Sequence, residues 1–172
     1  MSAELAPEQV AALLESTCAL LEAEIGALGE EESRWHPAPG EWCANEVLGH
    51  LVEAERRGFN GRIRLILSRD RPTFAPWDQV AVARERKDCD RMAESLWMEF
   101  LGIRHDSLAL VRSLRPADLE RGGTHGKVGW LRVKDLLHEW VHHDRNHTRQ
   151  MLANVQGRVW PHMANAQKFA GE

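Results

Sequence analysis

The fold that we predict for this chain is decided by residues 133–155, which have the sequence VKDLLHEWVHHDRNHTRQMLANV. Their apolar side chains recur at intervals of three and four, which is the spacing of an amphipathic α-helix. These side chains are Val133, Leu136, Leu137, Trp140, Val141, Met151 and Leu152. Such a stripe must be buried against other elements, so the chain needs partner helices of similar length.

Two segments before it carry the same pattern. Residues 7–28 begin with Pro7, a favoured first helical residue, and Gly29 ends the segment. Its stripe comprises Val10, Leu13, Leu14, Thr17, Leu20, Leu21, Ile25 and Leu28. A second helix starts near Cys43 and runs to a loop at residues 69–77. Its apolar face has regular helical spacing at Val47, Leu51, Ala54 and Gly58 and continues with less regular spacing at Phe59, Ile63 and Ile66.

Residues 78–114 predict a short helix followed by a long one, which Pro116 stops. The stripe of the long helix comprises Met92, Leu96, Phe100, Ile103, Leu110 and Leu114. Residues 30–41 and 115–129 are rich in glycine or proline and predict loops, the second with a brief extended piece. Gly157 and Pro161 predict the end of the last helix, followed by a short amphipathic tail.

Four amphipathic helices without an alternating strand pattern predict an all-α protein, a four-helix bundle with long interhelical connections. A chain of 172 residues, 43% hydrophobic and 28% charged, fits a globular protein, and we expect residues 1–172 to form a single helical bundle domain. Bundles host many chemistries, so the function has to be argued from a site.

Composition also excludes several classes of partner. A net charge of −4 without a concentrated basic face argues against nucleic acid. No apolar run approaches the roughly 20 residues of a membrane-spanning helix, and the first residues carry no secretory signal pattern. We therefore expect a cytoplasmic protein without a membrane partner. Cys18, Cys43 and Cys89 are widely spaced, which favours reduced interior thiols over disulfides or a zinc ribbon.

Two overlapping histidine pairs lie on the last helix. His138, Glu139 and His142 spell the H-E-x-x-H of zinc peptidases, and His143 and His147 form an H-x-x-x-H pair. Side chains four apart on a helix stand about 5 to 6 Å apart at Cβ, so either pair can bind one ion. At about 100° per residue, His147 and His143 lie about 60° and 100° from the centre of the apolar stripe, whereas His138 and His142 lie about 120° and 160° away. The second pair therefore borders the core and the first points to solvent.

A metal site in a bundle needs inward residues from facing helices, which favours His143 and His147. His50, about 65° from the middle of its local stripe, is the best third ligand. Four other histidines lie in loops or weakly patterned positions, where surface imidazoles explain them: His36, His105, His125 and His162. For His125, in the glycine-rich connection, an approach to the site is the less favoured alternative. A peptidase site would lack the further G-x-x-H continuation of its family, because Arg145 and Thr148 stand there.

Trp42, the run EVLGHL at residues 46–51, Asp135-Leu136-Leu137, the run HDRNH at residues 143–147 and Gln150 together resemble the DinB-like (DinB/YfiT) superfamily. The resemblance covers most of the chain. It implies a four-helix bundle in which one histidine of the second helix and an H-x-x-x-H pair of a later helix bind a divalent metal ion, commonly zinc or nickel. His50, His143 and His147 occupy those positions. Cys43 and Arg132 depart from the pattern, which often has Ser or Thr at these helix starts.

The resemblance implies several activities. Relatives include thiol transferases that use bacillithiol, mycothiol or glutathione, an isomerase and toxin-inactivating hydrolases. Three neutral histidines leave a coordination position open, which is typical of a catalytic site. The sequence thus predicts a metal-dependent thiol transferase or hydrolase that acts on a small electrophilic substrate, with a low-molecular-weight thiol as cosubstrate of the transferase.

Two alternatives stay open. One is a non-catalytic metal-binding or stress-related bundle, and the other is a zinc metallopeptidase that uses His138, Glu139 and His142. No general base is identified, and side chains that could orient the ligand rings are Glu46, Glu53, Glu139, Asp144 and Asn146. A homodimer through an apolar helix face is compatible with such a bundle.

Overall fold

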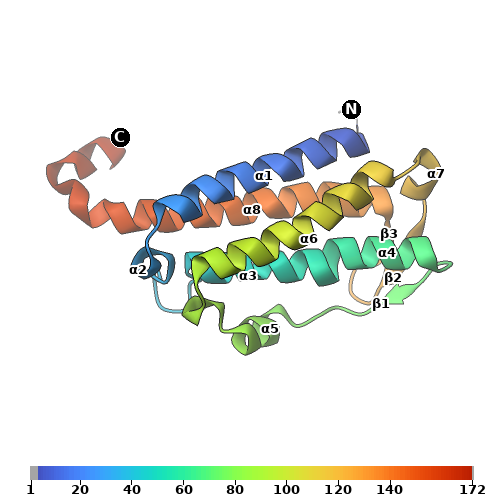
Figure 1. Ribbon diagram of the computed structural model, residues 1–172, viewed down its shortest axis with the longest axis horizontal. Coiled ribbons are helices and arrows are strands. Elements are labelled where there is room, and N and C mark those ends of the chain that lie inside the picture. Colours follow the sequence, from blue (N-terminus) through green and yellow to red (C-terminus); the bar gives the residue numbers. More distant parts are fainter. Residues whose placement is uncertain (1–3, 172) are drawn as a thin grey trace.

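The computed structural model describes residues 4–171, and helices dominate it (Figure 1). The chain order is α1 (Pro7–Ala27), α2 (Glu30–Ser33), α3 (Ala44–Glu53), η1 (Ala54–Phe59), α4 (Asn60–Ser68), β1 (Thr73–Phe74), α5 (Gln79–Arg86), η2 (Asp88–Asp90), α6 (Ala93–Ser113), α7 (Pro116–Leu119), β2 (Gly122–His125), β3 (Gly129–Arg132), α8 (Val133–Val159) and η3 (Trp160–Gly171). The four arms of the bundle are α1, the continuous run from α3 to α4, α6 and α8. The prediction of an all-α four-helix bundle is confirmed.

Apolar stripes of the four arms meet along the bundle axis. Helix α1 packs against α6 and α8, and α3 packs against the same two helices from the other side. One half of the core holds Leu14, Phe59, Ile63, Val111, Leu136 and Trp140, and the other half holds Leu21, Val47, Leu51, Leu96, Phe100 and Met151. Within residues 4–171, no helix is both long and apolar enough to cross a membrane.

The second arm contains a π-helical segment, η1, between α3 and α4. A wider turn shifts the face that later residues present, which explains why the apolar pattern becomes irregular after Ala54. The shift places Phe59 in the core, where its ring stacks on Trp140 with a centroid separation of 5.1 Å. Such segments are frequent at functional sites, and this one borders the histidine cluster described below.

Two helix starts depend on a carboxylate three residues downstream. Cys43 N–H donates to Glu46 Oε2 at 2.9 Å, and Arg132 N–H donates to Asp135 Oδ2 at 2.9 Å. The carboxylate thus satisfies a backbone donor where Cys43 and Arg132 replace the usual Ser or Thr.

Several connections differ from the sequence prediction. The loop predicted at residues 30–41 begins with the short helix α2, and Met92 is the exposed cap of α6 rather than part of its stripe. Helix α8 continues through Gly157 to Val159, because the Trp35 ring packs over Gly157 and Pro161 falls in the first turn of the next helix, where proline is tolerated.

A three-stranded sheet closes one end of the bundle. β1 pairs with β2 in parallel, with Phe74 opposite His125, and β2 pairs with β3 in antiparallel register. The strands are too short to show an alternating pattern in the sequence, so only a brief extended piece was predictable. The sheet fixes the position of His125 beside the cavity described below.

Candidate metal centre

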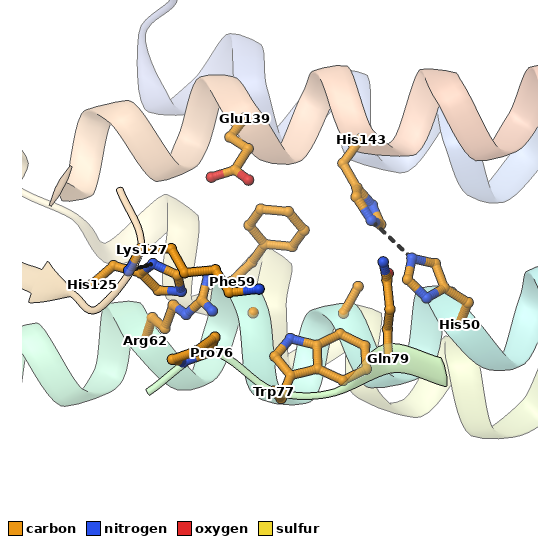
Figure 2. Close-up of a pocket in the computed structure, with 12 residues that line it drawn as sticks. His50, Phe59, Arg62, Pro76, Trp77, Gln79, His125, Lys127, Glu139 and His143 are labelled. Atoms are coloured by element: carbon orange, nitrogen blue, oxygen red, sulfur yellow. Dashed lines mark hydrogen bonds between the residues drawn. The ribbon is translucent and has the colours of Figure 1, made fainter. Parts of the chain in front are cut away.

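His50 on α3 and His143 and His147 on α8 converge on one point of the bundle. One nitrogen of each ring lies within 4.8 Å of the others. The Nε2 atoms of His50 and His143 are 3.0 Å apart, and the His147 ring centroid lies 4.4 Å from both other rings. Figure 2 shows His50 and His143 reaching toward each other from facing helices. The structure therefore brings together the three residues that the sequence selected.

Aromatic side chains hold these rings in place. Trp42 lies against His50 with centroids 4.9 Å apart and stacks on His147 at 6.2 Å. Trp77 also stacks on His50, with centroids 5.9 Å apart. Phe59 meets His143 edge-on at 5.2 Å. Each imidazole thus packs against at least one larger ring, which restricts its rotation.

Gln150 orients the third histidine. His147 Nδ1–H donates to Gln150 Oε1 at 2.9 Å, so the lone pair of Nε2 is left for the cluster. Four of the five side chains that the sequence offered for this task have other partners in the structure, and the fifth, Glu139, lines the cavity described below. Asp144 pairs with Arg104, Asn146 contacts His142, Glu46 caps α3, and Glu53 pairs with Arg56, Arg57 and Arg86.

All three imidazoles are held in the neutral form. Burial, together with the neighbouring imidazoles, lowers the pKa of His50 to about 3. Burial and His147 lower the pKa of His143 to about 3, and burial also lowers the pKa of His147. Neutral imidazole is the form that binds metal ions.

The donor set fits a divalent cation. The Nε2 atoms of His50 and His143 are 3.0 Å apart and need a proton or a cation between them. The other nitrogen of His143, Nδ1, is buried without a hydrogen-bond partner among residues 4–171. Ligand atoms around a tetrahedral zinc ion stand about 3.3 Å apart for bonds of about 2.0 Å. The observed separations therefore need only small adjustments.

The H-E-x-x-H residues do not form a comparable cluster. His138 is half-buried rather than directed to solvent, because the chain before α1 packs over it. Its Nδ1–H donates to Lys134 O at 2.8 Å, and its Nε2 accepts from Leu5 N–H at 3.0 Å. Both nitrogens of His138 are thus engaged, while His142 is exposed as predicted. This geometry does not support the peptidase alternative.

The histidine cluster opens onto a cavity of about 260 Å³ (Figure 2). His50 and His143 lie at one end, with Trp77 and Pro76 along one side. Arg62, His125 and Lys127 form the other end, and Glu139 projects from α8 between the two ends. A second cavity, of about 360 Å³, reaches the cluster between Trp42 and Gln150.

His125 was predicted as a surface imidazole, and this prediction was wrong. Only 8% of the residue is exposed, because the pairing of β2 with β1 places it against Phe74 with ring centroids 5.9 Å apart. Its Nδ1 accepts from Lys127 N–H at 3.2 Å. The glycine-rich connection therefore contributes a buried polar side chain to the cavity.

A buried ion cluster lies beneath the centre. Arg104 on α6 is 1% exposed and contacts the carboxylates of Glu55 and Asp144, the latter at 2.7 Å. It also donates to Leu14 O at 2.9 Å. Asp144 follows His143 directly, so this cluster anchors the ligand-bearing turn of α8 to α6 and η1. The sequence carried a signal for it, since Arg104 lies one turn from both Phe100 and Leu108 on the apolar face of α6.

The sequence model of the DinB superfamily matches residues 6–151. This chain belongs to the DinB superfamily. The resemblance in the sequence motifs is thereby confirmed.

Two proteins of similar sequence have names that state a metal dependence. A protein of Geobacillus thermodenitrificans, named "Putative metal-dependent hydrolase", is 26% identical over 163 residues, which are 92% of this chain and 88% of that protein. A protein of Oceanobacillus iheyensis with the same name is 22% identical over 121 residues, covering 70% of this chain and 69% of its own length.

Solved structures show the same fold. YfiT from Bacillus subtilis, described as "a probable metal-dependent hydrolase with an unusual four-helix bundle topology", superposes with a TM-score of 0.82 at 19% identity. That match covers 93% of this chain and 91% of YfiT. An uncharacterised protein from Clostridium difficile 630 gives a TM-score of 0.63 at 12% identity, over 88% of this chain and 96% of its own.

Proposed function

We propose that this DinB protein is a metal-dependent hydrolase of a small electrophilic substrate, with His50, His143 and His147 as the ligands of a divalent ion. The observation that carries the proposal is the convergence of three neutral imidazoles, two of which, His50 and His143, line the end of a cavity. The names of its relatives point in the same direction. Imidazole ligands suit zinc and nickel, which are the ions we propose.

Three protein ligands would leave at least one coordination position of a bound ion open to a water molecule or a substrate. When bound, such an ion supplies Lewis-acid activation of a water molecule or a thiol at neutral pH. The chain supplies the surroundings. The aromatic rings of Trp42, Phe59 and Trp77 fix the imidazoles and limit the access of bulk water to them.

Glu139 is our candidate for the group that accepts the proton of the nucleophile. It lies one turn before His143 on α8, and its carboxylate faces the same cavity (Figure 2). Among residues 4–171, Glu139 is the only acidic residue that lines this cavity, so it is the carboxylate available to a substrate there. The Glu of the H-E-x-x-H motif would thus serve the other histidine pair.

Arg62 and Lys127 give the far end of the cavity a positive charge. A substrate with a carboxylate or phosphate would place that group at this end and its electrophilic centre near the histidines. The substrate class that the cavity favours is therefore a small anionic ester or amide. In its hydrolysis, the oxygen of water would form a bond to the carbonyl carbon while a proton of that water passes to Glu139. The ester C–O or amide C–N bond would then break, and the leaving group would depart with the electron pair and take up the proton from Glu139.

Thiol transfer is the second candidate, and the positive end of the cavity also favours it. Low-molecular-weight thiols that carry carboxylates can place these at Arg62 and Lys127 and the sulfur near the histidines. In this reaction the S–H proton passes to Glu139, a C–S bond forms, and the leaving group departs with its electron pair. The remaining alternative is a non-catalytic bundle, in which the metal ion only crosslinks the helices. It would need neither the cavity nor its charged end.

An activity screen separates these proposals. Zinc-loaded and nickel-loaded protein is assayed with activated esters, and then with a small thiol and an alkyl halide. We expect turnover that His147→Ala abolishes with little loss of melting temperature, and that Glu139→Gln lowers while the bound metal is retained. The exposed His142→Ala is the matched control. A large fall in melting temperature in His147→Ala, with no turnover by the wild type, would favour the non-catalytic bundle in which the ion only crosslinks the helices.

A further inference from the structure

A second group of metal-binding side chains lies outside the histidine centre. It consists of His36 after α2, Cys43 and Glu46 at the start of α3, and Cys89 in η2. One ligand atom of each lies within 4.8 Å of the others. Figure 1 places α2, the start of α3 and the chain between α5 and α6 at one end of the bundle. Three separate stretches of chain thus meet at this group.

His36 is already oriented as a ligand. Its Nδ1–H donates to Glu41 O at 2.7 Å, so the lone pair of Nε2 is available. Nε2 lies 3.3 Å from Cys89 Sγ. Metal-binding histidines commonly donate the other ring N–H to a backbone carbonyl in this way.

Cys43 is fully buried at the N-terminus of α3, and the backbone N–H of Glu46 faces its sulfur. Burial raises the pKa of the Cys43 thiol, so this sulfur keeps its proton until a metal ion displaces it. Sulfur is a poor cap compared with the hydroxyl of Ser or Thr, so capping alone does not account for a cysteine here. Cys89 is half-buried, which gives an ion a route from solvent.

We propose that His36, Cys43, Glu46 and Cys89 form a second metal site that binds zinc or another thiophilic divalent ion. Tetrahedral zinc with bonds of about 2.0 to 2.3 Å places its ligand atoms about 3.3 to 3.8 Å apart. His36 Nε2 and Cys89 Sγ are 3.3 Å apart, and all four ligand atoms lie within 4.8 Å of one another. Two thiolates select against magnesium and calcium. Four protein ligands complete the coordination, so the site is structural rather than catalytic.

A disulfide between Cys43 and Cys89 is the competing outcome. It would use neither His36 nor Glu46, although both converge on the same point. The sequence pattern gave no sign of this group because 46 residues separate the two cysteines and 53 separate His36 from Cys89. Of the three thiols expected in the interior, Cys43 is buried, and Cys18 and Cys89 are half-buried.

An ion at this site would stabilise one wall of the histidine centre. Trp42, which packs against His50 and His147, directly precedes Cys43. Its carbonyl accepts from Asn154 Nδ2 at 2.8 Å, so α8 holds this residue from the other side. Fixing Cys43 and His36 to η2 therefore restricts the segment that carries Trp42.

Cobalt provides a direct test, because only a thiolate site gives a sulfur-to-cobalt charge-transfer band. Reduced, chelator-treated full-length protein is titrated with cobalt(II) and followed by absorption spectroscopy. We expect the band in wild type, in His147→Ala and in Cys18→Ser, which is the matched cysteine control. We expect its loss in Cys89→Ser. His36→Gln, at an exposed position, should weaken or shift the band without affecting the fold.

Zinc content gives the second readout. Wild type should retain about two zinc ions per chain, and Cys89→Ser and His147→Ala about one each. The proposal is overturned if reduced wild type shows no thiolate band, or if the band survives in Cys89→Ser. A Cys43–Cys89 disulfide in the zinc-loaded protein, detected by mass spectrometry, would also overturn it.

Discussion

His50 Nε2 and His143 Nε2 lie 3.0 Å apart, although the two residues are 93 positions apart in the chain. The packing of α3 against α8 creates this approach, and the buried surroundings keep both rings neutral. Two neutral nitrogens at this distance, with His147 beside them, form a cluster that a divalent cation would satisfy. The functional account depends on this one contact between two helices.

Gln150 should set the affinity of the centre without being a ligand. Gln150→Ala removes the acceptor of His147 Nδ1–H and frees the ring, so we expect zinc affinity to fall about 10- to 100-fold. The matched control is Asn146→Ala, one turn away, whose side chain contacts the exposed His142 instead. Competition with a chromophoric chelator measures both affinities. Equal affinities in the two variants would contradict the role of Gln150.

Arg104 should contribute strongly to stability. Arg104→Ala leaves Glu55 and Asp144 buried without their cationic partner, which we expect to cost about 3 to 5 kcal/mol in the free energy of unfolding. Arg112→Ala, on the same helix, removes an exposed pair with Glu15 and should cost about 0 to 1 kcal/mol. Urea denaturation gives both values, and similar costs in the two variants would show that the buried cluster is not structural.

Glu55 should make stability depend on pH. Burial, with the nearby charge of Asp144, raises the pKa of Glu55 to about 7. The Ser107 hydroxyl donates to Glu55 Oε2 at 2.7 Å, which by itself lowers the pKa of the carboxyl, but burial outweighs this hydrogen bond. A carboxyl whose pKa is raised on folding stabilises the fold at low pH, and this contribution is lost as the pH rises from about 4.5 through about 7.

Comparison with Glu55→Gln isolates this contribution. Over pH 5 to 7, the wild type should lose up to about 1.4 kcal/mol of unfolding free energy per pH unit relative to the variant. The metal-free histidines act oppositely, since their lowered pKa values reduce stability as the pH falls from about 6.5 toward 3, but they are common to both proteins. Parallel pH profiles of the two proteins would contradict a raised pKa for Glu55.

Helical periodicity was sufficient to predict the four arms, and the angular position of each histidine selected His50, His143 and His147. The same argument misplaced His138, because the segment before α1 that covers it has no periodic signal. His125 was missed for a related reason. Its burial depends on strand pairing between distant short segments, which a local pattern does not encode.

Polar clusters were the least predictable part of the site. Arg104 and Glu55 lie on apolar faces, but their pairing requires the shift introduced by η1 and the approach of α6. His36, Cys43 and Cys89 meet only because two connections fold against the start of α3. Sequence spacing identifies ligands on one helix, whereas these clusters depend on tertiary packing.

Zinc titration of chelator-treated protein tests the central claim most directly. The Cys89→Ser background leaves only the histidine centre to bind zinc, and calorimetry then compares this protein with versions that also carry His50→Ala or His142→Ala. We expect about one zinc ion per chain in the background and in the His142→Ala version, and loss of binding in the His50→Ala version. Undiminished binding in the His50→Ala version, or its loss in the His142→Ala version, would contradict the account.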